Sequence, residues 1–136
     1  MLGIPYDCAI DMWSFGCIIA ELYVGYPIFP GESEQDQLCR IMEMIGVPSN
    51  ELMRISERKQ RFFKYNDATQ TLDPLMFKNS RGKYRKPGGK PLDLVIGNED
   101  PDFTDFVSRC LTMDPRKRLT PNKALKHVWV LKGLPP

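Results

Sequence analysis

Apolar residues in positions 8–24 cover nearly every side of a helix. They are Met12, Trp13, Phe15, Cys17, Ile18, Ile19, Leu22 and Tyr23. Asp7 can cap the start of this helix, and Gly25 stands where a helix commonly stops. A helix that is apolar on all sides is enclosed by other elements in a soluble protein. We therefore expect a central buried helix over residues 8–24.

A second helix is predicted by a one-sided apolar pattern. Its apolar residues are Leu38, Ile41, Met42 and Ile45, at the spacing i, i+3, i+4 and i+7. Ser33 stands three residues before Asp36 and can cap the helix, which should end at Gly46. Pro48 and Ser49 can start a short third helix that runs through Met53.

Two more helix starts occur near the C-terminus. Asp100 followed by Pro101 is an N-cap with proline at the first helical position. The apolar residues after it, again at helical spacing, are Phe103, Phe106, Val107, Cys110 and Leu111. Thr120 and Pro121 repeat the start signal for a last helix through about His127, and an apolar segment at 128–131 follows it.

The periodic pattern decays between residue 54 and about Asn98. Turn-forming residues interrupt this stretch at Gly82, Pro87, Gly88, Gly89 and Pro91. Strand-like alternation of useful length is missing, so we expect a long insert loop with helical turns at most. The fold class predicted is therefore mainly α.

Composition and charge exclude few classes of protein. The 136 residues are 42% hydrophobic and 26% charged, as in a globular domain. Nineteen Lys and Arg against 17 Asp and Glu leave a net charge of +2, too small to indicate nucleic acid or an anionic membrane as partner. The four cysteines form no C-x-x-C pair and His127 is the only histidine, so we expect no zinc site and reduced thiols.

The start of the chain and its most apolar stretch do not fit a secreted or membrane protein. Residues 10–26 contain Asp11 and Glu21 and fall short of the roughly 20 apolar residues that a span needs. The N-terminus lacks the basic and apolar regions of a signal peptide. We expect a cytoplasmic or nuclear protein with no membrane partner.

Three segments, in this order, resemble the large lobe of eukaryotic protein kinases. Residues 10–22 read IDMWSFGCIIAEL and resemble the D-x-W-S-x-G start of that lobe's central helix. Residues 25–32, GYPIFPGE, are similar to the stretch that follows it in kinases of the dual-specificity tyrosine-regulated (DYRK) type. Residues 110–121, CLTMDPRKRLTP, with ALKH at 124–127, resemble the closing motifs of the lobe. The RKQRFF and NSRGK segments at 58–63 and 79–83 are similar to the DYRK branch of the CMGC group.

The resemblance implies a partial kinase C-lobe: a central buried helix, the helices after it and a long insert loop. It runs from Leu2 to Trp129, so we expect a partial kinase domain over residues 1–131, after the place of the A-P-E motif, and a tail at 132–136. The glycine-rich loop, the strand lysine, H-R-D and D-F-G, which handle ATP and magnesium in kinases, do not occur in the sequence. We therefore expect no catalytic, cofactor-binding or metal-binding residue in this chain, and ATP and magnesium only in an intact parent kinase.

Asp11 and Arg118 are the site residues that the resemblance implies, and both roles are structural. In the family, the residue matching Asp11 accepts hydrogen bonds from the catalytic loop; the plain alternative is a carboxylate favoured by the helix dipole. The residue matching Arg118 pairs with the glutamate of A-P-E; the alternative is a solvated member of the charge run at 116–118. Because that glutamate is missing here, we expect Arg118 to be exposed or paired with Asp114 or another carboxylate.

The remaining candidates have structural interpretations. Trp13 and Trp129 are expected to pack in the core, and His127 is expected to have a structural role. The six basic residues between Lys78 and Lys90 form either a solvated loop, which we favour, or a surface that attracts an acidic partner or RNA.

Two functions remain open from the sequence. One is a chain derived from a protein kinase, which is inactive alone while its parent phosphorylates protein hydroxyls. Such a chain can be a true fragment, the result of a wrongly assigned start at Met1, or a remnant. The other is a non-catalytic interaction module or pseudokinase remnant that binds protein substrates or a complementary kinase segment. Nucleic-acid binding is the least favoured. Because cover for one side of the first helix is missing, we expect the isolated chain to be marginally stable, prone to aggregation or dependent on a partner.

Overall fold

The computed structural model describes residues 9–75, 77–97 and 99–133, and these divide into two compact units. The first, which we call the insert unit, contains the described part of residues 29–89. The second, the helix unit, contains residues 9–28 together with the described part of 90–133. The predicted N-cap Asp7 and the tail at 134–136 lie outside the described residues.

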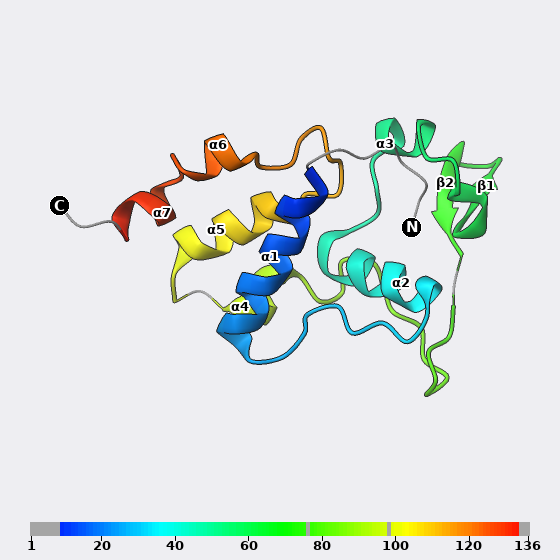
Figure 1. The fold of residues 1–136 in the computed structure, drawn as a ribbon. Coiled ribbons are helices and arrows are strands. Elements are labelled where there is room, and N and C mark those ends of the chain that lie inside the picture. The colour runs from blue at the N-terminus through cyan, green and yellow to red at the C-terminus, as the bar shows by residue number, and fades with distance from the viewer. Residues whose placement is uncertain (1–8, 76, 98, 134–136) are drawn as a thin grey trace. The chain divides into compact units, whose positions relative to one another are not determined.

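The helix unit is built around two packed helices. Its helices are α1 (Ala9–Val24), α4 (Leu92–Ile96), α5 (Pro101–Cys110), α6 (Pro121–Ala124) and α7 (Val128–Lys132). The helices α1 and α5 lie against each other, and α5 also contacts α4 and α7 (Figure 1). Both helix ends follow the sequence signals. Gly25 follows α1 with a φ of +88°, and the Asp100 side chain accepts a hydrogen bond from the Phe103 N–H at the start of α5.

A glycine allows α1 and α5 to approach closely. A Cβ atom added to Gly16 would lie 2.7 Å from the Cβ of Cys110 and 3.1 Å from a methyl carbon of Leu111. The core around this contact consists of Met12, Phe106, Cys110, Leu119 and Ala124, with Ile19, Trp129 and Val130 packed against it. The ring of Trp129 lies 4.9 Å from the ring of Phe106, so its predicted packing role is confirmed.

Only one face of α1 is buried in this chain. Met12, Gly16 and Ala20, spaced four residues apart, are its buried residues. On the opposite side, Ile18 is 54% and Leu22 78% exposed. The expected enclosure on all sides is therefore not reached, and the uncovered side predicted from the sequence is present.

The insert unit combines helices with a small sheet. Its elements are α2 (Glu34–Ile45), α3 (Asn50–Arg54), the 3₁₀ helix η1 (Lys59–Arg61), β1 (Phe63–Asn66) and β2 (Thr71–Pro74). The side chains of Ser33 and Ser49 cap α2 and α3, as the sequence predicted for both helices. The α2 helix ends at Gly46, which has a φ of +104°.

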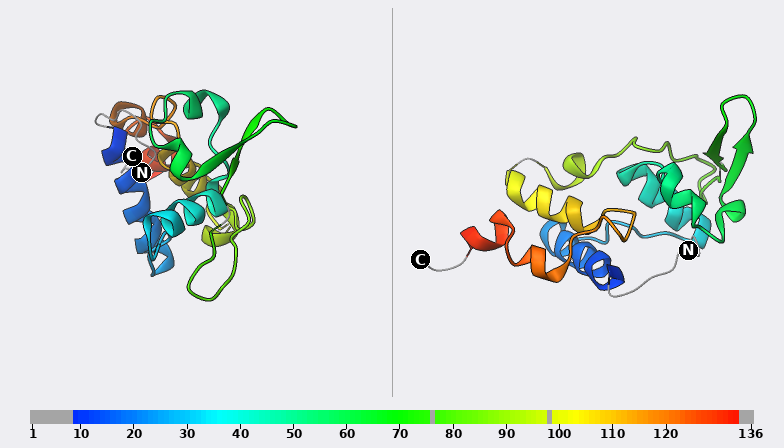
Figure 2. Two further views of the ribbon diagram at one scale, coloured as in Figure 1. Left: turned by 90° about the vertical axis from the view of Figure 1, so that its right-hand side faces the viewer. Right: turned by 90° about the horizontal axis from the view of Figure 1, so that it is seen from above.

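The hairpin of β1 and β2 corrects the prediction of a strand-free insert (Figure 2). The strands are antiparallel, with Phe63 opposite Pro74 and Tyr65 opposite Leu72. Each strand has only four residues, so the alternation is too brief to stand out from a loop. The connecting residues also lack glycine, and Gln70 takes the left-handed conformation with a φ of 55°.

The last helix predicted from the sequence, which was expected to run through about His127, ends earlier in the structure. The first part, α6, ends at Ala124, and the apolar segment forms the separate helix α7. His127 has an extended backbone, and its Nδ1 atom accepts a hydrogen bond from the Trp129 N–H at 3.0 Å. An imidazole that caps a helix start cannot sit inside the preceding helix, which explains the break.

The chain is mainly α-helical among its described residues, with one two-stranded sheet, which confirms the predicted fold class. None of the helices in this part of the chain combines the length and the hydropathy that crossing a bilayer requires.

Candidate functional site

Arg118 links the loop after α5 to the first turn of α1. Its Nε donates to the Thr112 carbonyl at 2.8 Å, its Nη1 to the Ala9 carbonyl at 2.9 Å and its Nη2 to the Met113 carbonyl at 3.0 Å. The guanidinium carbon lies 5.1 Å from the centre of the Trp13 ring, within cation–π range. The three nitrogens thus bind backbone of the loop after α5 and backbone of Ala9, which lies 109 residues before Arg118 in the sequence.

The structure places Arg118 half-buried rather than in open solvent. Asp114, its predicted partner, is 5% exposed and binds Arg116 through Nη2 at 2.8 Å and Nε at 3.0 Å. These bonds from Arg116 hold the pKa of Asp114 below its usual value. The sequence analysis did not predict that backbone carbonyls accept hydrogen bonds from Arg118. A pattern of side chains does not indicate which backbone carbonyls lack a partner.

Asp11 lies in the first turn of α1 with its side chain exposed. Among the described residues, it takes part in no hydrogen bond or ion pair. The position suits a carboxylate at the positive end of a helix. Asp11 and Arg118 therefore lie at the same end of α1, since Arg118 binds the carbonyl of Ala9, two residues before Asp11.

His127 is fixed by bonds to both ring nitrogens. Its side chain is 8% exposed, and Nε2 lies 2.7 Å from Oδ2 of Asp105. Because Nδ1 accepts from the Trp129 N–H, the neutral ring carries its proton on Nε2 and donates it to Asp105. Asp105 also accepts from Arg109 at 2.8 Å. This geometry supports a structural role for His127, whose partner Asp105 was not predicted from the sequence.

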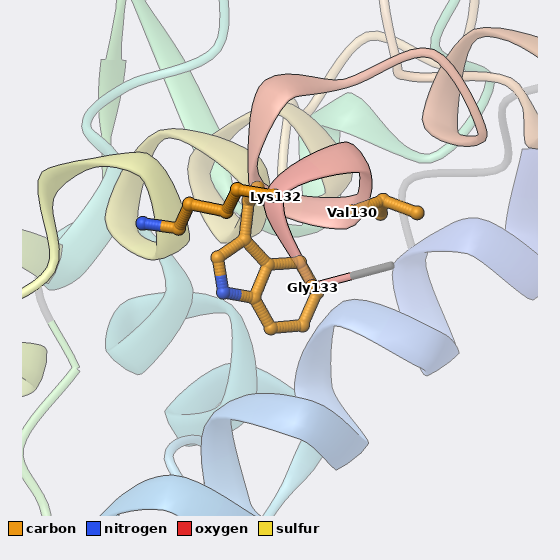
Figure 3. Close-up of a pocket in the computed structure, with 4 residues that line it drawn as sticks. Val130, Lys132 and Gly133 are labelled. Carbon is orange, nitrogen blue, oxygen red and sulfur yellow. The ribbon is translucent and has the colours of Figure 1, made fainter. Parts of the chain in front are cut away.

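A shallow pocket of about 540 Å³ lies at α7 (Figure 3). It is lined by Trp129, Val130, Lys132 and Gly133. The Lys132 ammonium group donates to Asp100 at 2.8 Å and to Asp102 at 3.2 Å. The lysine charge is therefore already matched by two carboxylates, which makes it a poor anchor for an anionic ligand.

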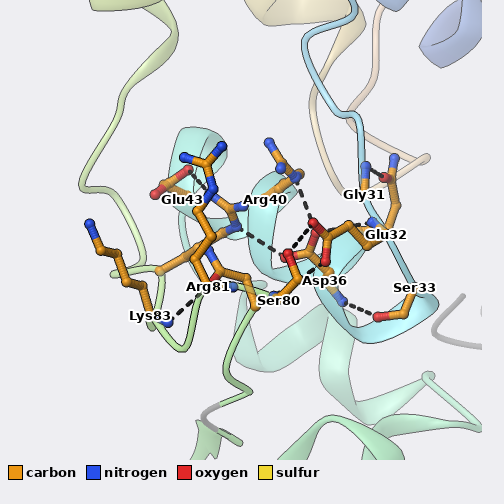
Figure 4. Close-up of polar contacts among 12 residues, drawn as sticks. Gly31, Glu32, Ser33, Asp36, Arg40, Glu43, Ser80, Arg81 and Lys83 are labelled. Atoms are coloured by element: carbon orange, nitrogen blue, oxygen red, sulfur yellow. Dashed lines mark hydrogen bonds and ion pairs between the residues drawn. The ribbon is translucent and has the colours of Figure 1, made fainter.

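Asp36 is the centre of a polar network in the insert unit (Figure 4). Its carboxylate is nearly buried and accepts from the Glu32 N–H at 3.0 Å, from Arg40 Nε at 3.2 Å and from Arg85 Nε at 3.0 Å. Burial by itself raises the pKa of Asp36, but the bonds from Glu32, Arg85 and Arg40 outweigh it and lower the pKa. Arg85 also lies 3.6 Å from Glu43.

The network changes the interpretation of the basic segment between Lys78 and Lys90. Arg85 is held by carboxylates of α2, and the Ser80 hydroxyl donates to Glu32 at 2.7 Å. Part of this segment is therefore tied to the helix rather than solvated. Asp36 and Glu43 stand seven residues apart on one side of α2, a spacing that could have indicated a basic partner.

The described cysteines are free thiols with suppressed ionisation. Burial raises the pKa of Cys17 and of Cys110 to about 11, and burial also raises the pKa of Cys39. Because the thiolate is the nucleophile, a raised pKa disfavours nucleophilic reaction at these thiols.

Comparison with known proteins agrees with the resemblance of the three sequence segments to protein kinases. The family described as the protein kinase domain matches residues 2–130. Dual specificity tyrosine-phosphorylation-regulated kinase 4 of Homo sapiens is 48% identical over 130 residues, which are 96% of this chain and 24% of that kinase. Kinase 2 of the same name from Drosophila melanogaster is 46% identical over 130 residues, 96% of this chain and 17% of that protein.

A third relative, dual specificity tyrosine-phosphorylation-regulated kinase 3 of Rattus norvegicus, is 42% identical over 147 residues, which include 99% of this chain and 25% of that kinase. The chain thus spans a quarter or less of the length of these three relatives.

Proposed function

Because this chain belongs to the protein kinase family and is of the DYRK type, we propose that it is the inactive lower part of an enzyme that phosphorylates protein hydroxyl groups. The observation that carries the proposal is the match of the protein kinase domain to residues 2–130, a range that includes α1 and Arg118, which binds its first turn. The parent would transfer the γ-phosphoryl group of ATP with magnesium. Residues 1–131 would form the kinase-derived part, and 132–136 a tail.

The residues present do not fit ATP or magnesium. Magnesium sites in kinases use carboxylate and amide oxygens held together around the phosphates. Among residues 9–75, 77–97 and 99–133, no three His, Cys, Asp or Glu side chains gather as a metal site would require. The sequence also contains no glycine-rich loop, H-R-D or D-F-G motif. We therefore infer that this chain performs no step of phosphoryl transfer and that Asp11 and Arg118 have structural roles.

An activity measurement tests this proposal. The purified chain is incubated with magnesium and ATP labelled on the γ-phosphate, together with a basic serine-containing peptide, and ATP binding is measured by calorimetry. We expect no labelled peptide and no binding heat. Turnover that depends on magnesium would refute the proposal, provided that a chain with Arg118→Ala loses it in parallel and so excludes a contaminating kinase.

The second candidate function is a non-catalytic interaction module, and the exposed apolar side of α1 favours it. Phe15, Ile18 and Leu22 are 42%, 54% and 78% exposed on one helix. Such a stripe on a soluble protein is commonly covered by another surface. The partner would be a complementary kinase segment or a protein substrate, in the cytoplasm or nucleus, with no role for a membrane or nucleic acid.

A reconstitution experiment separates the two candidates. The chain is mixed with the N-terminal part of the kinase domain of the human relative, ending before the segment that this chain matches. Restored magnesium-dependent phosphorylation would support origin from an enzyme whose remaining parts complete the site. Stable association without activity would support the interaction module, and no association would contradict the assignment of a complementary kinase segment as the partner.

A further inference from the structure

A second pocket lies wholly within the insert unit, away from the residues that the kinase motifs assign. It has a volume of about 540 Å³ and opens between α3, η1 and one face of the hairpin. Phe63 and Tyr65 alternate along β1 and so share a face, and Leu72 lies opposite Tyr65 on β2. Together with Met53 of α3, these side chains give the pocket an apolar floor.

The side chains at the floor of the pocket are buried, whereas one side chain of its wall is exposed to solvent. Met53 is 2% and Phe63 3% exposed, so both are held by the core of the unit. Tyr65 is 54% exposed and leaves an aromatic surface free for contact. A large apolar side chain that enters the pocket would contact the buried Met53 and Phe63 and the exposed ring of Tyr65. Ligand pockets are usually formed before the ligand binds, and this arrangement is of that kind.

Two cations without acidic partners stand at the rim. Among the described residues, Arg54 and Lys59 form no ion pair, although both line the pocket. Their neighbours differ, because Arg58 and Arg61 both bind Glu34, at 2.8 and 3.5 Å. The basic residues of this segment are thus divided into a pair used by the fold and a pair that faces the pocket.

We propose that this pocket docks a short peptide segment of a partner protein, with one large apolar side chain on the floor and a nearby carboxylate at Arg54 and Lys59. The charge of the rim is complementary to an acidic residue, and the side-chain amides of Asn50, Gln60 and Gln70 offer donors and acceptors for peptide backbone. The volume lies within the range of about 300–1,000 Å³ typical of ligand pockets. Phosphoryl transfer plays no part in this docking, so it goes beyond the function proposed above.

The test uses the full 136-residue chain, labelled with ¹⁵N, and two peptide pools. One pool holds blocked heptapeptides with a central Leu or Phe flanked on both sides by Glu or Asp. The other replaces the acidic residues by Gln and Asn. We expect saturable binding with amide shifts centred on α3, η1 and the hairpin, and about two- to thirty-fold tighter binding of the acidic pool, because two exposed ion pairs contribute modestly.

Matched variants test whether the preference for acidic peptides comes from Arg54 and Lys59. Arg54→Gln with Lys59→Gln should abolish the preference for the acidic pool. Arg81→Gln with Lys83→Gln changes the net charge equally at two exposed residues outside the pocket and should preserve it. Tyr65→Ser removes half-exposed aromatic surface from the wall and should weaken both pools alike. All three variants must keep the amide dispersion of the parent chain.

Several results would overturn the proposal. These are equal affinity for both pools, an acidic preference that survives Arg54→Gln with Lys59→Gln, shifts centred outside the insert unit, or no saturable binding below about 1 mM. Displacement of the acidic peptides by a single-stranded oligonucleotide of similar length would assign the cations to nucleic acid instead.

Discussion

At the scale of single residues, Arg118 shows how one guanidinium can hold separate segments together. Its planar fork directs three nitrogens to the carbonyls of Thr112, Met113 and Ala9. A lysine offers one compact charge and cannot reach three carbonyls in different directions. The first turn of α1 is therefore fixed by a residue near the far end of the chain.

We predict that Arg118→Ala lowers the free energy of unfolding by about 2–4 kcal/mol, because several charge-assisted bonds and the contact with Trp13 are lost. Arg118→Lys should lose less. Urea denaturation followed by circular dichroism measures both. Arg81→Ala, at an exposed position, serves as the control and should stay within about 0.5 kcal/mol of the parent chain. A similarly small effect of Arg118→Ala would contradict the anchoring role.

We also predict that the chain loses stability in acid because of Asp105 and Asp114. The bond from His127, with help from Arg109, lowers the pKa of Asp105, and the bond from Arg116 lowers that of Asp114. As the pH falls, these carboxyl groups are therefore protonated first in the unfolded chain, where their pKa is about 3.9. The stabilisation is complete above that value and is lost as the pH falls through the lower folded pKa.

Urea midpoints measured between pH 6 and about pH 3 should stay level at first and decline below about pH 4. The double change Asp105→Asn with Asp114→Asn should flatten that decline. If the decline is equally steep without the two carboxylates, other groups control the acid response.

At the scale of elements, the contact between α1 and α5 depends on a missing side chain. Gly16 lies where a Cβ atom would stand 2.7 Å from the Cβ of Cys110, closer than two such atoms approach. The helices would have to separate to admit even a methyl group. Cys110 is fully buried, so the neighbouring core would move with it.

Gly16→Ala therefore sets two effects against each other. Alanine favours the helix by up to about 1 kcal/mol, but overpacking of a tight core costs about 1–3 kcal/mol. We predict a net loss of stability, measured as a lower thermal midpoint. Ser14→Ala, at an exposed position of the same helix, should be neutral or slightly stabilising. A stabilised Gly16→Ala chain would show that the two helices pack less closely.

The sequence predicted elements well where a chemical signal marked their ends. Ser33, Ser49 and Asp100 cap the helices expected of them, because a side-chain oxygen that binds a backbone N–H acts locally. The hairpin was missed because its strands are brief and their pairing joins residues that no local pattern connects. The Asp36 network was missed for the same reason, since Asp36 and Arg85 lie 49 residues apart.

At the scale of the whole molecule, the chain exposes apolar surface on the helix that its family motif would bury. Leu22 is the most exposed residue of the stripe on α1, and each large apolar side chain left in water forfeits about 1.5–3 kcal/mol relative to burial. The core of the helix unit contains Met12 on the opposite side of α1, and of the stripe residues Phe15 contacts this core through the ring of Phe106. Covering this stripe therefore has more effect on solubility than strengthening the core.

We predict that Ile18→Gln with Leu22→Gln reduces self-association and leaves the free energy of unfolding within about 0.5 kcal/mol per site. Light scattering against protein concentration measures the association. Leu125→Gln is the matched control, since Leu125 is 67% exposed but lies outside α1. Equal improvement by the control would mean that general polarity, rather than the α1 stripe, governs association.

The contacts of Arg85 and Ser80 with Asp36 and Glu32 affect the residues that lie between them in the sequence. Arg85 with Asp36, and Ser80 with Glu32, close a loop of nearly fifty residues that contains α3 and the hairpin. A protease that cuts the exposed hairpin turn at residues 67–70 would produce two pieces. The pieces would remain joined by the contacts of Asp36 with Arg85 and of Glu32 with Ser80. The nicked insert unit should therefore migrate as one particle under native conditions and fall apart only in denaturant.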